Sequence, residues 1–382
     1  MIENQTSRVV RVCFVCPKAY PLFNKAVEGD FGGAEVDLYY LATELANEEN
    51  FDVSVIVADY GQGDVESIEN VTVIKSLDFG KNALAGAVRI WRALKQANAD
   101  IYIIKTASVG VPLVATFCGL HKKAFVYRTA HQDECDGTYL RNHKLVGRLF
   151  AASLRGAKIV VAQNDSDREK LKATIAVDSR VIPNAHRLSE PDPSQRDSIL
   201  WVGRSVGFKR SQLFLDLAEK FPDEKFVMIC QRATGDKHYD ELLDRSENIP
   251  NLQFHQRVGF NEIGKYFQTA KIFVNTSLAE GFPNTFIQAC MHSTAIVSLN
   301  VDPDDFLQRY SCGISCRDDI AKLNEAVAFM LDSRHYIDIG RNGRKYVEEN
   351  HDIANIINIY KAEFRKIMRE KTKVTETDKN DS

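Results

Sequence analysis

The segment most suited to chemistry is 280–288 (EGFPNTFIQ), which directly follows the apolar run 272–276. An apolar run followed by a glycine loop and a proline predicts a strand, a turn at Gly281 and a helix whose first residue is Pro283. The N-terminus of such a helix presents backbone N–H groups and a positive dipole end, which can hold a phosphate. Glu280, on the same loop, can accept hydrogen bonds from ligand hydroxyls. The structural alternative is an ordinary turn with a solvated carboxylate.

Two cations follow the first predicted strand of the same half of the chain. In the segment 202–209 (VGRSVGFK), Arg204 and Lys209 come at the carboxyl end of that strand. A forked guanidinium and a compact ammonium can together neutralise a diphosphate. The alternative is that both are ordinary surface cations in contact with water.

A third segment, 29–35 (GDFGGAE), ends the loop after the first predicted strand and opens a helix. Gly32 and Gly33 would let the backbone approach a ligand closely at the helix N-terminus, and the alternative is a plain turn with a helix cap. The segment does not have the G-x-G-x-x-G spacing of dinucleotide-binding proteins. The absence of this spacing disfavours a nicotinamide-dependent dehydrogenase.

Short β-branched runs alternate with segments of helical period in both halves of the chain. This alternation predicts parallel sheets with helices on both faces, so the fold class is α/β with two doubly wound domains. The predicted strands are 9–16, 53–58, 71–74, 101–104, 124–128, 159–162, 198–202, 225–229, 252–255, 272–276 and 295–298. The predicted helices are 34–48, 83–97, 211–220, 263–268, 283–292, 320–332, 335–349 and 353–369. The non-periodic segment 184–197, with Pro191 and Pro193, is the predicted linker.

Composition narrows the classes of function. A chain of 382 residues exceeds what one core usually organises, and its net charge of -3 gives no basic field for nucleic acid, which is not expected as a partner. The eight cysteines are scattered and residues 1–7 are polar, so a cytoplasmic location is expected. The longest apolar stretch, 111–120, is about half the length of a membrane-spanning helix of roughly 20 residues.

Segments 202–209 and 280–288, with Gly32 and Gly33 upstream, resemble the family 4 (group 1) retaining glycosyltransferases of the GT-B fold. The resemblance extends to 181–184 (VIPN) and 342–351 (NGRKYVEENH) and covers the chain up to its polar tail. It implies two Rossmann-like domains that face a cleft, with a C-terminal helix that crosses back to the N-terminal domain. The implied parts are an acceptor-side domain at 1–185, a nucleotide-sugar-binding domain at 186–350, a crossover helix at 351–369 and a disordered tail at 370–382.

The resemblance also implies the activity. Such enzymes transfer a sugar from a nucleotide-diphosphate-sugar to a glycan or lipid-linked acceptor, with retention and without a metal or other cofactor, often in cell-envelope polysaccharide or lipopolysaccharide synthesis. It assigns His131, in 127–136 (YRTAHQDECD), to a contact with the donor sugar, and it makes His131, Glu280, Arg204 and Lys209 the catalytic residues. The implied donor-binding residues are Gly32, Gly33, Gly203, Gly281, Phe282, Pro283, Asn284, Thr285 and Gln288. Fixed cations and helix N–H groups would stabilise the charge on the departing diphosphate.

The sequence departs from the family pattern at two places. Gln288 stands where the family usually has a second Glu bound to the donor ribose, and Ser-Thr-Ala at 293–295 replaces a Gly-x-Pro turn. A glutamine can still accept and donate hydrogen bonds, but it carries no charge. These departures leave open a degenerate, non-catalytic sugar-nucleotide binder. A GT-B-fold sugar-nucleotide epimerase, which uses the same donor cleft without an acceptor, is the other alternative.

Two patterns that resemble metal motifs have structural explanations, and no metal site is predicted. Residues 165–167 (DSD) match a D-x-D motif, but they precede a helix, with Ser166 and Glu169 at capping-box spacing. Cys13 and Cys16 form a C-x-x-C within a predicted strand, where their odd separation puts them on opposite faces.

The segment 139–158 predicts a basic helix in the acceptor-side domain. It carries Arg141, Lys144, Arg148 and Arg155 together with Leu145, Leu149 and Leu154. Such a helix could contact anionic lipid at the inner face of the cytoplasmic membrane, which would suit a lipid-linked acceptor. The alternative is a solvated face over a buried apolar stripe.

Overall fold

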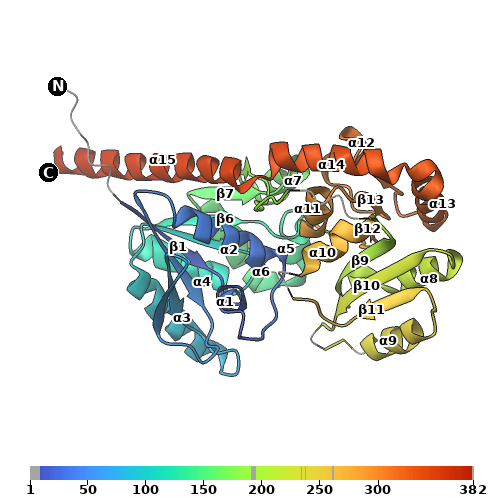
Figure 1. Ribbon diagram of the computed structural model, residues 1–382. Coiled ribbons are helices and arrows are strands. Elements are labelled where there is room, and N and C mark those ends of the chain that lie inside the picture. Colours follow the sequence, from blue (N-terminus) through green and yellow to red (C-terminus); the bar gives the residue numbers. More distant parts are fainter. Residues whose placement is uncertain (1–8, 191–194, 234, 237, 260–261, 381–382) are drawn as a thin grey trace. The chain divides into compact units, whose positions relative to one another are not determined.

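The β-branched runs of the sequence form two separate sheets in the computed structural model, which describes residues 9–190, 195–233, 235–236, 238–259 and 262–380 (Figure 1). The chain divides into unit 1, which contains the residues up to Arg187 and those from Ile353 onward, and unit 2, Leu188–Asp352. The first crossing between the units falls within the predicted linker 184–197. Pro191 and Pro193 of that linker lie outside the described residues.

The sheet of unit 1 has the order β3-β4-β2-β1-β5-β6-β7-β8. Its strands are β1 (Val10–Val15), β2 (Phe51–Val57), β3 (Val65–Ile68), β4 (Val71–Lys75), β5 (Ile101–Lys105), β6 (Ala124–Arg128), β7 (Ile159–Ala162) and β8 (Arg180–Val181). All neighbouring pairs are parallel except β3 and β4. The inner strands are apolar along nearly their whole length because helices cover both faces of the sheet.

Helices α3, α4 and α6 lie side by side and close one core of unit 1 against the sheet. The helices of this unit are α1 (Tyr20–Phe23), α2 (Gly33–Leu45), α3 (Ala83–Ala97), α4 (Gly110–Leu120), η1 (Gln132–Glu134), α5 (Thr138–Asn142), α6 (Lys144–Arg155), α7 (Asp165–Ile175) and α15 (Ile353–Asn380). Helix α15 packs on α2 and β1, which confirms the prediction that the C-terminal helix returns to the N-terminal domain.

Unit 2 contains a second parallel sheet, with the order β11-β10-β9-β12-β13-β14. Its strands are β9 (Ser198–Arg204), β10 (Lys225–Gln231), β11 (Leu252–His255), β12 (Ala270–Asn275), β13 (Ala295–Ser298) and β14 (Gly313–Ser315). Its helices are η2 (Gly207–Lys209), α8 (Gln212–Lys220), α9 (Tyr239–Glu247), α10 (Ile263–Thr269), α11 (Asn284–Met291), η3 (Pro303–Asp305), α12 (Phe306–Arg309), α13 (Ile320–Leu331), η4 (Asp332–Arg334) and α14 (Tyr336–Asn350). The predicted class of two doubly wound α/β halves is confirmed.

Three short strands, β3, β8 and β14, were not predicted. Each lies at or next to the edge of a sheet and has two to four residues without a continuous apolar run, so backbone pairing and not side-chain burial defines it. The helix predicted to begin at Pro283 begins at Asn284. Pro283 is its N-cap, with the extended backbone that precedes a helix.

The predicted disordered tail at 370–382 is wrong as far as Asn380, because α15 continues through it. The segment has no glycine or proline to end the helix, and its first residues are bonded to the body of unit 1. Lys371 Nζ donates to the carbonyl of Asp100 at 3.0 Å, and Glu370 forms an ion pair with Lys158 at 2.6 Å. Residues 381–382 lie outside the described part of the chain.

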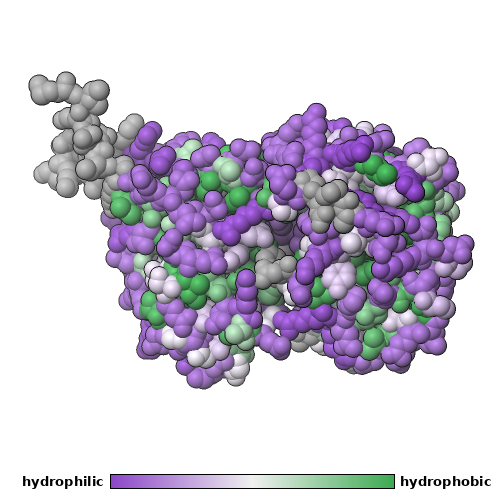
Figure 2. Space-filling view, viewed as in Figure 1, coloured by the Kyte–Doolittle hydropathy of each residue, from purple (hydrophilic) through white to green (hydrophobic). Residues whose placement is uncertain are grey.

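The surface seen in Figure 2 is mostly hydrophilic, with smaller hydrophobic areas on it. Among the described helices, none is both long and apolar enough to cross a bilayer.

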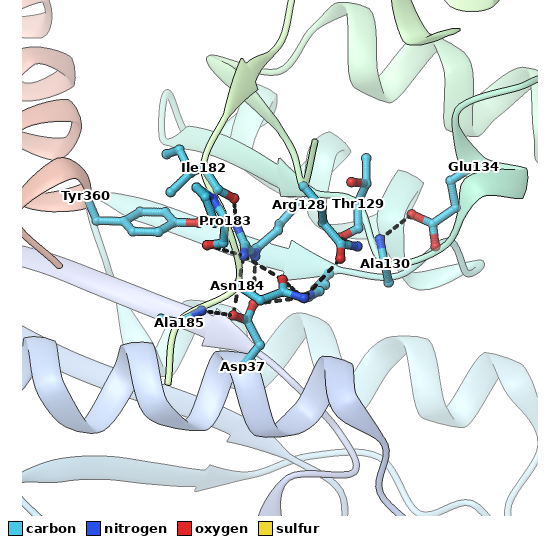
Figure 3. A network of polar contacts seen from close by, with 12 residues as sticks. Asp37, Arg128, Thr129, Ala130, Glu134, Ile182, Pro183, Asn184, Ala185 and Tyr360 are labelled. Carbon is cyan, nitrogen blue, oxygen red and sulfur yellow. Dashed lines mark hydrogen bonds and ion pairs between the residues drawn. The ribbon is translucent and has the colours of Figure 1, made fainter. Parts of the chain in front are cut away.

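A buried ion cluster ties the elements of unit 1 together (Figure 3). Asp37 of α2 accepts hydrogen bonds from Lys105 Nζ, at the end of β5, and from Arg128 Nε, at the end of β6, at 2.7 and 2.6 Å. All three side chains are at most 3% exposed. Burial alone would raise the pKa of Asp37, but the two cations hold it well below its usual range, whereas burial lowers the pKa of Lys105 to about 8.

The cluster also holds both segments through which the chain passes between the units. Arg128 donates to the carbonyls of Ile182 and Pro183 before the first crossing and to Tyr360 Oη of α15 after the second. The backbone N–H of Ile353 donates to the carbonyl of His186 at 3.0 Å, which joins the two segments directly. The Arg128 guanidinium therefore anchors the two segments of unit 1 that precede and follow unit 2 in the sequence.

We expect Asp37→Asn to destabilise unit 1 by about 3–5 kcal/mol, because it leaves two buried cations without their counter-charge. Urea unfolding followed by Trp91 fluorescence in a Trp201→Phe background reports on unit 1, since the chain has two tryptophans, one in each unit. The matched control is Asp52→Asn, an exposed residue near the start of β2, with an expected change within about 0.5 kcal/mol. Equal effects of the two changes would contradict the assigned role of the cluster.

Candidate functional site

In unit 2, two of the predicted catalytic residues, Lys209 and Glu280, meet where two neighbouring strands end. β9 and β12 are adjacent and parallel, so the loops that follow them leave the sheet at the same edge. The loop after β9 contains η2 and ends at Lys209, and the loop after β12 carries Glu280. Lys209 Nζ lies 2.8 Å from Glu280 Oε2, so the structure brings these two predicted residues into direct contact.

The pair is largely, but not fully, shielded from water. The side chains of Lys209 and Glu280 are 15% and 14% exposed. Asn275 Nδ2, at the end of β12, donates to Glu280 Oε1 at 3.0 Å. Burial would raise the pKa of the Glu280 carboxyl, but Lys209 together with hydrogen bonds from Asn275 and Ser277 holds it below its ordinary value. Glu280 is therefore a charged acceptor at neutral pH.

Thr276 joins the loop after β12 to the loop after β9 through hydrogen bonds. Its hydroxyl donates to the carbonyl of Lys209 at 2.6 Å and accepts from Trp201 Nε1 at 2.9 Å. Arg210 Nε donates to the carbonyl of Thr276 at 2.8 Å. The position of Lys209 relative to Glu280 thus depends on bonds to the backbone as well as on the ion pair.

The remaining donor-site candidates of unit 2 occupy the same edge in different ways. Gly203 and Arg204 end β9, where Arg204 is exposed and a Cβ on Gly203 would lie only 2.8 Å from the ring of Trp201. The N-terminus of α11, with Asn284 and Thr285, follows Gly281 and Pro283. These positions bring a cation and a positive helix end to the edge that carries Glu280.

The Phe282 ring points into the core of unit 2. It is 7% exposed and lies 5.0 Å from the ring of Phe306 and 4.9 Å from that of His351, between centroids. Phe282 can therefore face a donor only through its backbone, and its ring anchors the loop. Gln288 lies one helical turn into α11 and is half-buried.

In unit 1, the candidates lie at the carboxyl edge of the sheet but two strands apart. Gly32 is the N-cap of α2 and Gly33 its first residue, after β1, whereas His131 follows β6, and β5 lies between these strands. Glu35 Oε2 accepts from the backbone N–H of Gly32 at 2.7 Å. This bond caps the helix, so the capping role foreseen as the alternative for Gly32 is present.

His131 lies in a tight turn between β6 and η1. Its Nδ1 accepts from the backbone N–H of Asp133 at 3.2 Å and lies 3.4 Å from Asp133 Oδ1, and the first of these contacts assigns the proton of a neutral ring to Nε2. Glu134, which the sequence did not single out, closes the same turn by accepting from the backbone N–H of Ala130 at 2.9 Å. Asn275 and Glu134 were both missed, although a polar residue at or just beyond the end of an apolar strand was a usable signal.

The D-x-D residues 165–167 form the first turn of α7, and the residue that caps the helix is not the one predicted. The N-cap is Asn164, whose side chain accepts from the backbone N–H of Asp167 at 2.7 Å and donates to its carboxylate at 3.1 Å. The Ser166–Glu169 box is wrong because the N-cap lies two residues before Ser166. Within the described residues, no group of three or more His, Cys, Asp or Glu side chains could hold a metal ion.

Two family models match the chain, one in each half. Residues 31–190 match the model described as Glycosyltransferase Family 4, and residues 196–333 match the model described as Glycosyl transferases group 1. Together they include every candidate site residue. No curated protein matches the chain at a significant level.

Solved structures of similar fold are glycosyltransferases. Sucrose-phosphate synthase from Thermosynechococcus elongatus superposes with a TM-score of 0.78 at 15% identity, over 94% of this chain and 100% of that one. An E. coli trehalose-6-phosphate structure with bound UDP-2-fluoro glucose has a TM-score of 0.68 at 11% identity, over 93% of this chain and 98% of that one. WaaG, a glycosyltransferase involved in lipopolysaccharide biosynthesis, has a TM-score of 0.67 at 16% identity, over 92% of this chain and 98% of that one.

We expect Lys209→Met to destabilise unit 2 by about 1–3 kcal/mol at pH 7, because it leaves the Glu280 carboxylate buried without a cation. The loss should shrink as the pH falls from 7 toward 5. Burial then raises the pKa of Glu280 in the variant, which binds a proton, whereas in the wild type the pKa stays low and the group stays charged.

Urea unfolding monitored by Trp201 fluorescence in a Trp91→Phe background measures this effect. Lys220→Met, at the end of α8, is a suitable control because Lys220 is exposed. A destabilisation that does not depend on pH would show that Glu280 is not the group that Lys209 neutralises.

Proposed function

The chain belongs to the family 4, group 1 glycosyltransferases, and we propose that it transfers a sugar from a nucleotide-diphosphate-sugar to a glycan or lipid-linked acceptor. We propose further that transfer retains the anomeric configuration, needs no metal ion, and serves cell-envelope polysaccharide or lipopolysaccharide synthesis. The observation that carries the proposal is the contact between Lys209 and Glu280 beside the N-terminus of α11.

This arrangement suits a donor with two chemically different ends. The diphosphate is an anion, and Arg204, Lys209 and the α11 N-terminus bring positive charge to this edge of the sheet. The sugar and ribose carry hydroxyls, and the charged Glu280 can accept hydrogen bonds from them. A donor diphosphate would also supply Lys209 with a second anionic partner and leave a Glu280 oxygen available to a hydroxyl.

The proposed catalytic roles follow from the charge that develops during transfer. As the bond from the anomeric carbon to the diphosphate breaks, the diphosphate leaves with the electron pair, and Arg204 and Lys209 stabilise its charge. The acceptor oxygen bonds to the anomeric carbon, and its proton passes to an oxygen of the departing diphosphate. His131, with its proton on Nε2, donates a hydrogen bond to a sugar hydroxyl and so orients the ring.

Gln288 is the residue that we assign to recognition of the donor ribose. It replaces the second glutamate of the family pattern and lies in α11, the helix whose start receives the diphosphate in this proposal. A neutral amide that can both donate and accept makes a weaker bond to a ribose hydroxyl than a carboxylate does. We propose that Gln288 keeps the ribose contact with lower affinity.

A thermal-shift screen against UDP-, GDP-, ADP- and CMP-sugars without added metal tests the donor site. A ligand at 100 times its dissociation constant should stabilise the wild type by about 2.7 kcal/mol. Glu280→Ala should respond much less, because it loses the acceptor of sugar hydroxyls. Glu247→Ala, an exposed carboxylate at the end of α9, should respond as the wild type does. No response to any of the four in the wild type would refute the donor assignment.

Product analysis then separates the open alternatives. A glycosyltransferase releases nucleoside diphosphate and forms a glycosylated acceptor, and an epimerase changes the donor sugar when no acceptor is present. A non-catalytic binder gives the thermal shift without turnover of the donor. Each outcome identifies one of the three.

One observation in unit 1 favours peripheral contact with an anionic membrane. Of the three leucines on the predicted basic helix, Leu154 is buried, but Leu145 and Leu149 are 70% and 48% exposed. Lys144 and Arg148 of α6 are exposed beside them. A solvated face would not place two large apolar side chains in water, whereas a lipid interface takes up both the leucines and the cations.

The neighbouring helices carry similar residues at the same end. Leu84 and Val88, in the first turns of α3, are 82% and 50% exposed, and Val109, the N-cap of α4, is 71% exposed. Helices α3, α4 and α6 lie side by side, and as crossover helices between parallel strands they all begin at the carboxyl edge of the sheet. The proposed membrane face therefore lies on the same side of unit 1 as His131.

We expect the wild type to co-sediment with vesicles that contain anionic phosphatidylglycerol and not with neutral phosphatidylcholine vesicles. Lys144→Gln with Arg148→Gln should weaken this binding about 30-fold, on the basis of roughly 1 kcal/mol for each cation at the surface. Arg141→Gln with Arg155→Gln is the matched control, because both arginines donate to protein acceptors such as the carbonyl of Ile175. Equal binding by the two double variants would rule out this face.

A further inference from the structure

Glu134 is a buried carboxylate that forms no ion pair within the described part of the chain, and the reaction proposed above does not use it. It ends η1, three residues after His131, and is 3% exposed. Its Oε2 accepts from Tyr127 Oη at 2.8 Å and from the backbone N–H of Ala130 at 2.9 Å, and its Oε1 accepts from the backbone N–H of Ala107 at 3.1 Å. The carboxylate is held by hydrogen bonds from three separate positions.

One of these bonds shapes the turn that carries His131. The bond from the Ala130 N–H to Glu134, drawn in Figure 3, joins the residue before His131 to the residue that ends η1. The backbone N–H of Glu134 also donates to the carbonyl of His131 at 3.1 Å. With the Asp133 N–H bonded to Nδ1, both the ring and the carbonyl of His131 are fixed within one short turn.

The third bond reaches the loop after β5, next to a strained residue. Thr106 has a positive φ of 75°, which is rare for a β-branched residue and persists only where the surrounding structure enforces it. The backbone N–H of Thr106 donates to the carbonyl of Arg128, and the next N–H, that of Ala107, donates to Glu134. The carboxylate therefore helps to hold this conformation and joins the loop to the His131 turn.

The hydrogen-bond pattern favours a geometric role for Glu134 over proton transfer. Burial raises the pKa of the Glu134 carboxyl above its ordinary value, and the hydrogen bonds to the carboxylate and the nearby His131 offset this only in part. All three bonds run from a donor to the carboxylate, so they require its oxygens as acceptors. A buried acceptor with three donors specifies one arrangement, because any other leaves a polar group without a partner.

We propose that Glu134 is a positioning residue for sugar transfer, whose buried carboxylate fixes the His131 turn and the Thr106–Ala107 loop relative to each other. The proposal rests on the glycosyltransferase function proposed above and adds a residue that acts through His131 and not on the substrate itself.

The first test determines which ring nitrogen of His131 carries the proton in the wild type. Long-range ¹⁵N–¹H correlation spectra of the histidine-labelled protein, assigned by loss of one signal in His131→Gln, should show a neutral ring with its proton on Nε2. A proton on Nδ1 would overturn the proposal, since the bond from the Asp133 N–H would then be absent. This measurement needs neither a substrate nor a Glu134 variant.

The second test is Glu134→Gln, which keeps the shape of the side chain but turns an –NH₂ group toward at least one N–H or O–H donor. With the nucleotide-sugar selected by the thermal-shift screen, kcat for release of nucleoside diphosphate should fall at least 30-fold. The donor dissociation constant should stay within about 2-fold, because the proposed diphosphate contacts are in unit 2. The His131 signal should also lose its single tautomer.

Tyr127→Phe is the matched control, because it removes one donor to the same carboxylate and leaves both backbone bonds. Its kcat should stay within about 3-fold of the wild-type value. A folded Glu134→Gln variant with wild-type kcat would overturn the positioning role while leaving the proposed function intact. If no nucleotide-sugar binds the wild type, it is the proposed function that fails, and the tautomer measurement still decides the geometry.

Discussion

The fold of unit 1 depends on one buried carboxylate. Asp37 is enclosed by two cations from neighbouring strands, and none of the three side chains is more than 3% exposed. A charge at this depth is tolerated only when its partners are in place, so α2, β5 and β6 cannot shift independently. Because Arg128 also bonds to Ile182, Pro183 and Tyr360, the same constraint extends to both segments that lead to unit 2.

The ion pair in unit 2 has a different character, although it too lies at the carboxyl edge of a parallel sheet. Lys209 and Glu280 keep about a seventh of their side-chain surface in contact with solvent, and Glu280 shares its second oxygen with an amide. Such a pair can exchange partners when a ligand arrives, whereas the Asp37 cluster cannot without disrupting the unit. The exposed fraction of the side chains thus distinguishes the buried Asp37 cluster, which stabilises the fold, from the Lys209–Glu280 pair, which solvent and small molecules can reach.

Much of this architecture could be predicted from the sequence, because apolar runs such as Ala124–Arg128 and Ala295–Ser298 are continuous and flanked by clear breaks. The edge strand Arg180–Val181 could not, since only its backbone pairing defines it. Glu280 and Lys209 were singled out because a glycine loop and cations follow two predicted strands, and the structure brings their side chains into contact. Asp37 was missed because its cationic partners come from distant parts of the chain, and a single sequence does not show which residues meet. Asn275 and Glu134 each bond to a residue nearby in the sequence, Glu280 and Ala130, but the loop conformations that bring these groups together cannot be read from the sequence.

Unit 1 is assembled from two pieces of chain with the whole of unit 2 between them. A ribosome therefore completes the sequence of unit 2 before it makes α15, and the N-terminal piece must wait for its last helix. During that interval Arg128 has no Tyr360 hydroxyl to bond, and the surface of α2 that α15 covers is open to water or to a chaperone. All residues of unit 2 are therefore made before α15, whereas unit 1 reaches its final form only after α15 has left the exit tunnel.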